Sequence, residues 1–210
     1  MASVVFYFQV HQPHRLRRYS VFDTDPFYFD DDANKDILLK VTEKCYRPAT
    51  KLILDLVKKN GGNFRVSYAI TGTVLEQLER WAPDVIELFQ QMAETGCVEF
   101  LGETYFHSLA FLYSREEFRE QVDMHTRKIE QLFGQTPRVF RNTELTYNND
   151  VAHFVNEMKD ADGNPRWKGI LAEGVDRILE YRSPNHVYRP PNTGEGPGGR
   201  PFALLLKNYR

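Results

Sequence analysis

The alternation of two kinds of segment is the feature that most restricts the fold of this chain. Short, nearly continuous apolar runs are separated by longer segments in which apolar residues recur every three to four positions. Runs of the first kind are typical of strands buried on both faces, and segments of the second kind are typical of helices. Strands alternating with helices predict an α/β fold in which parallel strands are joined by right-handed crossovers. The six strands are expected at 3–10, 64–70, 97–103, 138–145, 169–174 and 202–208.

Capping signals mark the starts of two of the intervening helices. Thr73 with Glu76, and Ser114 with Glu117, have the spacing in which a hydroxyl caps a helix and a carboxylate reaches back to the cap residue. The first helical segment keeps one apolar face, which Pro48 interrupts. Helices are therefore expected over 35–59, 73–81, 83–96, 114–133 and 149–159.

Composition and charge argue against several classes of protein. The 210 residues are 41% hydrophobic and 27% charged, which is typical of one soluble domain with a core. The net charge is -2 and no long basic run occurs, so we expect no nucleic-acid partner. No apolar stretch reaches membrane-spanning length and the N-terminus lacks the basic region of a signal peptide, so we expect a cytoplasmic protein without membrane contact.

The two cysteines carry no metal-binding signal. Cys45 and Cys97 fall in segments assigned to a helix and a strand, and neither belongs to a motif with metal-ligand spacing. Both are expected to be buried free thiols of a cytosolic protein. The sequence predicts no metal and no other cofactor.

The last part of the sequence predicts an irregular segment and an unfinished domain. Residues 183–201, SPNHVYRPPNTGEGPGGRP, are too rich in Pro and Gly for a regular element, so they form either a flexible connector or a loop over a binding site. An apolar strand follows them, and a parallel strand buried on both faces needs a further covering element. We therefore expect residues 1–210 to be the N-terminal part of a larger domain.

Polar side chains gather where the expected strands end. Ligands of parallel α/β proteins meet the chain outside the carboxyl ends of the strands, so such residues are candidates for a binding cleft. The candidates are His11 and His14 after the first strand, Glu103, Tyr105 and His107 after the third, Glu144 in the fourth and Glu173 in the fifth.

Several of these residues also have a purely structural interpretation. A Glu at a strand end is often the first-turn acid of the next helix, but the helix after Glu144 is expected to start only near Asn149. His11 could be a structural histidine, and His125 lies close to the apolar face of its helix, which indicates a core position. Residues 30–32, DDD, are expected to cap a helix, whereas the aromatic residues of 19–29 either pack the loop or form sugar platforms.

Three of the strand-end segments together resemble motifs of glycoside hydrolase family 57. These segments are HQP at 11–13, GETYFHS at 102–108 and FRNTEL at 140–145, in this order and each at the end of an expected strand. The family is retaining and acts on α-glucans, and it includes amylases and glucan-modifying transferases; the spacing here is most similar to its α-amylase-type members. The resemblance spans nearly the whole chain and implies an incomplete, TIM-barrel-like (β/α)7 barrel.

The resemblance also implies roles for particular residues. Glu144 matches the catalytic nucleophile, and His11 and Glu103 match residues of the sugar-binding pocket. The place of His107 in the second motif adds it to the predicted substrate-binding residues. Arg141 and Asn142 are both candidates for supporting the Glu144 carboxylate. Strand alternation favours Asn142, because Arg141 points the other way unless the strand has already ended.

The second carboxyl group of the retaining mechanism is missing from the recognisable motifs. The resemblance implies that the general acid is an Asp of a later motif, and no such motif occurs before Arg210. Glu103 and Glu173 are the internal candidates. Catalysis by this mechanism is therefore expected to need residues beyond this part of the sequence.

The predicted function is that of a retaining α-amylase-like enzyme whose substrate is an α-glucan or maltooligosaccharide. Two alternatives remain open at this point. The pair HQPH and His107, beside several carboxylates, is compatible with a metal-dependent carbohydrate deacetylase, although such sites usually need an Asp and two His in a firm spacing. A glucan-binding fragment without turnover would also explain the aromatic residues together with the missing general acid.

Overall fold

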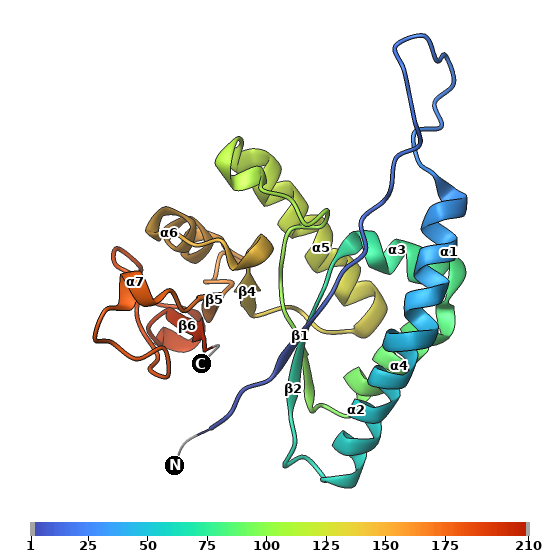
Figure 1. The fold of residues 1–210 in the computed structure, drawn as a ribbon. Helices are drawn as coiled ribbons and strands as arrows, with labels where there is room; N and C mark the ends of the chain where they lie inside the picture. Colours follow the sequence, from blue (N-terminus) through green and yellow to red (C-terminus); the bar gives the residue numbers. More distant parts are fainter. Residues whose placement is uncertain (1–2, 209–210) are drawn as a thin grey trace. The chain divides into compact units, whose positions relative to one another are not determined.

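The computed structural model describes residues 3–208, and these residues form two compact units. Figure 1 shows the course of the chain through both. The N-terminal unit contains the chain up to Phe100, Tyr105–His107 and Lys128–Gln135. The C-terminal unit contains Leu101–Thr104, Ser108–Arg127 and the chain from Thr136 onward.

The N-terminal unit is built on a three-stranded parallel sheet in the order β1-β2-β3. The strands are β1 (Tyr7–Val10), β2 (Val66–Ile70) and β3 (Val98–Phe100). Their register aligns Tyr7 with Ser67 and Val66 with Val98. Parallel pairing with helices between consecutive strands confirms the predicted fold class for this unit.

Five helical segments between the strands, and the last turns of the later helix that ends at Phe133, accompany this sheet. The five segments are α1 (Asp31–Val41), a π-helical turn (Thr42–Tyr46), α2 (Arg47–Lys59), α3 (Gly72–Trp81) and α4 (Pro83–Glu94). The apolar side chains of these helices and of the sheet form one core, and a stacked pair lies in it: the Phe100 and Phe133 rings are 4.3 Å apart at an angle of 11°. The Phe89 ring meets Phe100 edge-on at 6.4 Å, an arrangement that aromatic pairs favour.

The predicted helix over 35–59 is interrupted by a π-helical turn. Pro48 is the second residue of α2, and a proline ring inside a regular α-helix clashes with the carbonyl group four residues earlier. The chain avoids this clash through a wider turn, in which the Arg47 N–H donates to the Thr42 carbonyl five residues back. The helix therefore continues past the proline instead of ending there.

The predicted cap of α3 is wrong by two residues. Thr71, not Thr73, is the N-cap, and its hydroxyl oxygen accepts a bond from the Val74 N–H at 3.4 Å. Because β2 ends at Ile70, the helix begins directly after the sheet, and Thr73 already lies in its first turn. Glu76 is then free of the capping role and forms a different contact, described below.

The C-terminal unit has a second three-stranded parallel sheet in the order β4-β5-β6. Its strands are β4 (Val139–Arg141), β5 (Gly169–Glu173) and β6 (Ala203–Lys207). Gly102 adds a parallel bridge to Phe140 of β4, and a Cβ atom on Gly102 would lie 2.3 Å from the Trp167 ring, so only glycine fits there. All six predicted strands are present, and each of them is shorter than predicted.

The C-terminal unit contains the two helices predicted for this part of the chain and a short third helix that was not predicted. They are α5 (Arg115–Phe133), whose last turns belong to the N-terminal unit, α6 (Asn149–Glu157) and α7 (Asp176–Leu179), with 3-10 turns at Ala110–Leu112 and Pro197–Gly199. The Ser114 hydroxyl accepts from the Glu117 N–H at 3.1 Å, which confirms this predicted cap. Trp167, Phe140 and Phe118 are fully buried in the core of the unit.

The Pro- and Gly-rich segment 183–201 is held against this sheet and is not a free connector. Tyr188 exchanges two backbone hydrogen bonds with Leu204 of β6, at 2.9 and 2.7 Å. The Gly194 N–H donates to the Asn156 side chain at 2.7 Å, which ties the segment to α6. These bonds satisfy backbone groups that would otherwise be exposed at the edge of β6.

Candidate active site

Glu144 lies in a strained turn directly after β4. The predicted strand 138–145 ends at Arg141, and Thr143–Leu145 form a 3-10 turn. Glu144 has φ 52° and ψ 26°, and Leu145 has φ 55°, so two consecutive non-glycine residues adopt the left-handed conformation. Each such residue costs on the order of 1–3 kcal/mol, and strain of this kind concentrates at functional sites. Leu145 is buried while Glu144 is exposed, so the turn fixes an outward-facing carboxylate.

Side-chain hydrogen bonds within the C-terminal unit hold this turn. The Thr143 hydroxyl donates to the Ser108 carbonyl at 2.7 Å and lies 3.0 Å from the Thr104 hydroxyl. The Asn142 amide donates to the Thr146 carbonyl at 3.0 Å. Thr104 and Thr143 therefore join the GETYFHS and FRNTEL segments. No pattern in the sequence indicates this contact.

Asn142 is a structural part of the turn, whatever else it does. Its amide nitrogen is used on the Thr146 carbonyl, and its buried Oδ1 atom has no hydrogen-bond partner among residues 3–208. Buried polar atoms are rarely left without partners, and the exceptions call for a specific explanation. The predicted contribution of Asn142 to the site stays a prediction.

Glu103 lies beside Arg141 in the interior of the C-terminal unit. Glu103 is fully buried, and its Oε2 atom is 3.9 Å from Nη1 of Arg141, itself almost fully buried. This distance makes an ion pair and exceeds that of a hydrogen bond. The Nε and Nη1 atoms of Arg141 have no hydrogen-bond partner in the described part of the chain. Sequence reasoning did not foresee this pair, because it depends on the bridge between Gly102 and β4.

The two predicted histidines meet in the N-terminal unit. The rings of His11 and His107 stack with their centroids 4.1 Å apart at an angle of 26°. Nδ1 of His11 lies 2.9 Å from the hydroxyl oxygen of Thr71, the cap of α3. His107 has φ 54°, so it too is held in the left-handed region. The motifs at 11–13 and 102–108 thus contribute to one imidazole pair.

The HQP segment is also fixed by helical residues that carry no motif. The Tyr46 hydroxyl, at the end of the π-helical turn, donates to the His11 carbonyl at 3.2 Å and accepts from the Gln12 amide at 3.2 Å. The Gln77 amide on α3 donates to the Gln12 carbonyl at 3.0 Å. The segment after β1 is therefore held by the side chains of Tyr46 and Gln77 and by Thr71, the N-cap of α3.

Glu76 joins Tyr105 of the second motif to His14, the residue that directly follows the first motif. Its two carboxylate oxygens lie 2.7 Å from the Tyr105 hydroxyl, which donates, and 3.3 Å from Nε2 of His14. Burial, and then the bond to Glu76, raise the pKa of Tyr105 above its usual range, so this phenol stays protonated and donating. The Tyr105 ring packs on Gly72, where a Cβ atom would lie 2.5 Å from it.

A Tyr105→Phe variant tests this arrangement through the pH dependence of stability. The folded-state pKa of Tyr105 is raised above the unfolded value of about 10, so its contribution is present below about pH 10 and is lost as the pH rises further. Urea unfolding should find the variant about 1–2 kcal/mol less stable than wild type at pH 7, with a smaller difference at pH 10.5. Tyr113→Phe, at an exposed position, is the control, and an equal deficit at both pH values would contradict the assignment.

The other predicted residues take the following places. Glu173 lies in β5 and pairs with Lys207 of β6 at 3.4 Å, so it is a cross-strand partner. His125 is fully buried, as predicted, and Asp30 caps α1 by accepting from the Ala33 N–H at 3.0 Å. Cys97 is buried but Cys45 is exposed on the π-helical turn, so the prediction for Cys45 was wrong. Within residues 3–208, no three His, Cys, Asp or Glu side chains are grouped to hold a metal ion, and no helix of this part could cross a membrane.

Parallel strands alternating with helices, with histidines and carboxylates in the loops after them, define an α/β protein of the class that carries its site at the strand ends. The family model for Glycosyl hydrolase family 57 matches residues 5–210, and the chain belongs to this family. The resemblance inferred from the three motifs is thereby confirmed.

Known proteins similar to this chain carry several related names. A protein of Methanocaldococcus jannaschii named "Putative alpha-amylase" is 38% identical over 211 residues, which cover 99% of this chain and 42% of that protein. The 4-alpha-glucanotransferase of Thermococcus litoralis has a similar fold, with a TM-score of 0.68 at 15% identity over 98% of this chain and 27% of its own. The family 57 branching enzyme of Pyrococcus horikoshii also has a similar fold, with a TM-score of 0.65 at 16% identity over 98% of this chain and 47% of its own. The chain thus spans less than half the length of these relatives, and the two structures support its α/β barrel-type fold.

Proposed function

We propose that the protein containing this chain is a retaining, α-amylase-like glycoside hydrolase in which Glu144 is the nucleophile. The observation that carries this proposal is the strained turn after β4, which holds an exposed carboxylate where parallel α/β proteins bind their ligands. Family membership and the printed name of the Methanocaldococcus relative support an α-glucan as the substrate class.

The proposed reaction has two steps. The Glu144 carboxylate attacks the anomeric carbon, the bond to the leaving sugar oxygen breaks, and a general acid protonates that oxygen. The same acid then acts as a base, and it removes a proton from the water that hydrolyses the glycosyl-enzyme. We place this second carboxyl group in the part of the protein that follows residue 210, and the chain described here is its N-terminal catalytic portion.

The remaining predicted residues are proposed to bind and position the sugar. His11 and His107, fixed by their mutual stacking and by Thr71, present ring nitrogens that can exchange hydrogen bonds with hydroxyl groups. Glu103 and Arg141 act together as a buried charged pair at the base of the Glu144 turn. Asn142 has an amide oxygen that can accept one further bond.

The stereochemistry of the first product tests the proposal. The protein expressed from its complete reading frame would be incubated with maltoheptaose, and the anomeric protons would be followed by NMR. Two displacements at one carbon retain its configuration, so the first products should be α anomers that mutarotate slowly. First products with the β configuration would overturn the nucleophile, and binding without any turnover would favour a glucan-binding protein. Longer oligosaccharides among the products would identify transfer to a sugar acceptor.

A further inference from the structure

Between β1 and α1 the N-terminal unit carries a braced hairpin, residues 15–30, which we call the arm. Figure 1 shows it extending beyond the start of α1. Leu16 and Phe29 form an antiparallel bridge, and the Arg17 N–H donates to the Tyr28 carbonyl at 3.0 Å. At its base the Arg15 N–H donates to the side chain of Asn34, a buried residue of α1, at 2.8 Å.

The middle of the arm is cross-linked by its own side chains. The Arg17 guanidinium binds both Asp25 carboxylate oxygens, at 2.6 and 2.5 Å, and lies over the Tyr19 ring at 5.1 Å. The Tyr19 hydroxyl donates to the Asp25 carbonyl at 2.5 Å, and the Tyr19 and Tyr28 rings are 4.7 Å apart. The arm is therefore a built element with a defined surface.

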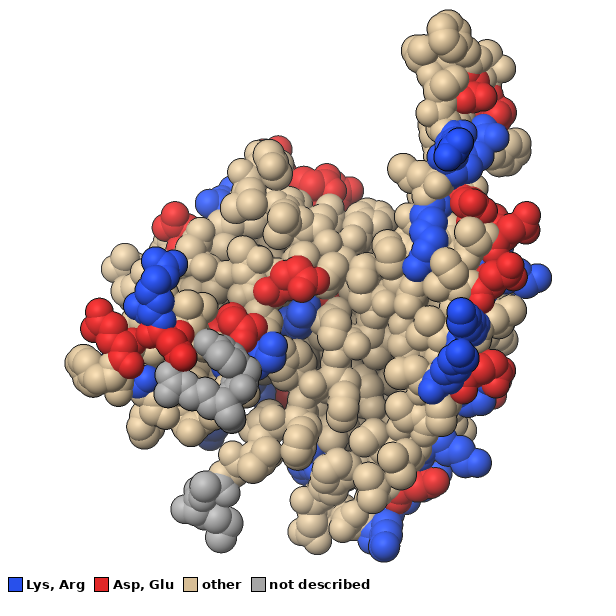
Figure 2. Space-filling view, viewed as in Figure 1, with Lys and Arg blue, Asp and Glu red and all other residues tan. Residues whose placement is uncertain are grey.

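That surface is aromatic and open. Phe22 is 89% exposed, Phe27 72%, Phe29 52% and Tyr28 51%. Tyr19 and Tyr28 pack against each other within the loop, as the first interpretation of residues 19–29 expected, whereas Phe22 and Phe27 are largely exposed. Figure 2 shows few charged side chains on the visible face at the outer end of the arm, and more near its base. Single exposed aromatics are common, but a cluster on one braced hairpin indicates a binding surface.

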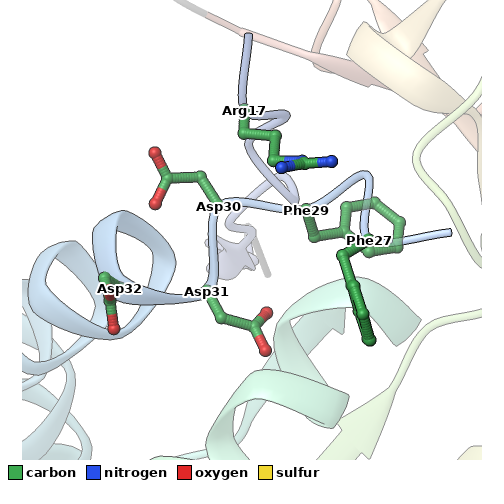
Figure 3. Close-up of a pocket in the computed structure, with 6 residues that line it drawn as sticks. All are labelled: Arg17, Phe27, Phe29, Asp30, Asp31 and Asp32. Carbon is green, nitrogen blue, oxygen red and sulfur yellow. The ribbon is translucent and has the colours of Figure 1, made fainter. Parts of the chain in front are cut away.

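A hollow of about 390 Å³ lies at the base of the arm, and its walls differ in chemistry. Figure 3 shows the rings of Phe27 and Phe29 with the Arg17 guanidinium on one side, and Asp30, Asp31 and Asp32 of the α1 start on the other. The Phe29 ring packs against the His14 ring, and the ring centroids are 5.0 Å apart. The volume falls in the range of small-ligand sites, which combine aromatic walls with a few polar groups.

Only some of the carboxylate oxygens of Asp30, Asp31 and Asp32 form hydrogen bonds or ion pairs with other residues of the protein. Asp31 binds Arg80 at 2.7 Å, and one Asp30 oxygen accepts from the Ala33 N–H at 3.0 Å. The side chain of Asp32 is exposed and takes no part in a hydrogen bond or ion pair within residues 3–208. Acceptor oxygens are thus available to a ligand that donates hydrogen bonds.

The two walls select among ligand classes. An anionic ligand such as a phosphate ester would be repelled, because three carboxylates line the hollow and its one guanidinium, that of Arg17, is already paired with Asp25. A purely apolar segment would remove these carboxylates from water without giving them hydrogen bonds, which is unfavourable. A sugar ring satisfies both walls, since its C–H face stacks on an aromatic ring while its hydroxyl groups donate to carboxylates.

We propose that the arm is an additional sugar-binding site, in which one unit of an α-glucan chain stacks on Phe27 and donates hydrogen bonds to the Asp30–Asp32 wall. The choice of an α-glucan as the sugar rests on the proposed function. The arm begins four residues after His11, so a glucan held there is bound by the segment that directly follows the first motif. Its role is to retain long substrates, and short substrates that do not reach the arm gain nothing from it.

Phe27→Ala is the decisive variant, and Phe22→Ala is its matched control, because both rings are exposed on the arm and only Phe27 lines the hollow. Retardation of the complete protein in amylose-containing gels would measure binding without requiring turnover. The loss of one stacking contact should weaken retardation by about tenfold for Phe27→Ala, with a change within about twofold for Phe22→Ala. Phe27→Trp should restore it.

Kinetics separate this inference from the proposed function. For Phe27→Ala, kcat/KM should fall by about tenfold on long amylose and stay unchanged on a short nitrophenyl maltoside. Normal retardation of Phe27→Ala would overturn the arm site even if amylose is cleaved, and so would absence of retardation in wild type. Retardation that depends on Phe27, without any cleavage, would support the arm site while refuting the enzyme. Equal losses in both variants, or a change in sedimentation mass, would identify a contact between proteins and overturn the sugar site.

Discussion

Replacing Glu144 by Gln should reduce glucan cleavage by the complete protein on the order of 10⁴-fold or more, while amylose binding stays within about threefold of wild type. The amide keeps the size of the side chain but cannot attack the anomeric carbon. Rates of maltoheptaose cleavage together with amylose-gel retardation would measure both effects. Glu173→Gln is the matched control, because Glu173 is also a glutamate near the end of a parallel strand but is paired with Lys207.

Glu144→Gly makes the same test sharper. Glycine suits φ 52°, so this variant should be no less stable than wild type although it lacks the carboxylate. Added azide could then take the place of the nucleophile and yield a glycosyl azide of inverted configuration. Turnover that survives in the Gln variant would refute the assignment of Glu144.

Replacing Arg141 by Met should lower the free energy of unfolding by about 3–5 kcal/mol, because Glu103 would remain fully buried without its guanidinium partner. Urea unfolding at pH 7 would measure the loss. The double variant Arg141→Met with Glu103→Leu should recover most of the stability, since apolar replacements of a buried ion pair are often close to neutral.

A stable Arg141→Met single variant would mean that the pair contributes little to folding. The double variant also separates stability from function. If it folds normally but binds amylose less well than wild type, the buried pair serves the sugar site and not the fold alone.

The order of elements was predictable because it depends on local patterns. Apolar runs and helical periodicity located all six strands, and Ser114 began α5 as its spacing with Glu117 indicated. Thr73 and Glu76 showed the same spacing, yet Thr71 caps the helix, since the end of β2 at Ile70 brings the helix forward. The capping pattern indicates that a helix starts nearby, and the end of the preceding strand determines the residue at which it starts.

The site was predictable in its residues but not in its geometry. The prediction that Asn142 and Arg141 point to opposite faces assumed a strand that continues to Leu145. Because β4 ends at Arg141, strand alternation does not apply to Asn142. The Arg141–Glu103 pair and the Tyr105–Glu76–His14 contacts join positions that are far apart in sequence, and no local pattern encodes them. The exposure of Phe22 and Phe27 likewise depends on how the arm folds upon itself.

The π-helical turn at Thr42–Tyr46 changes the direction in which side chains point around the helix axis between α1 and α2. It accommodates one more residue than an α-helical turn, so the side chains of α2 are rotated by about 100° from where an unbroken continuation of α1 would place them. Tyr46 can therefore reach the His11 carbonyl while Leu54 and Val57 of α2 still enter the core. Deleting a single residue here would straighten the segment, and either the tyrosine or the core residues would then face the wrong way. In comparisons among relatives, a one-residue gap between 42 and 46 would therefore mark chains that hold their HQP segment by other means.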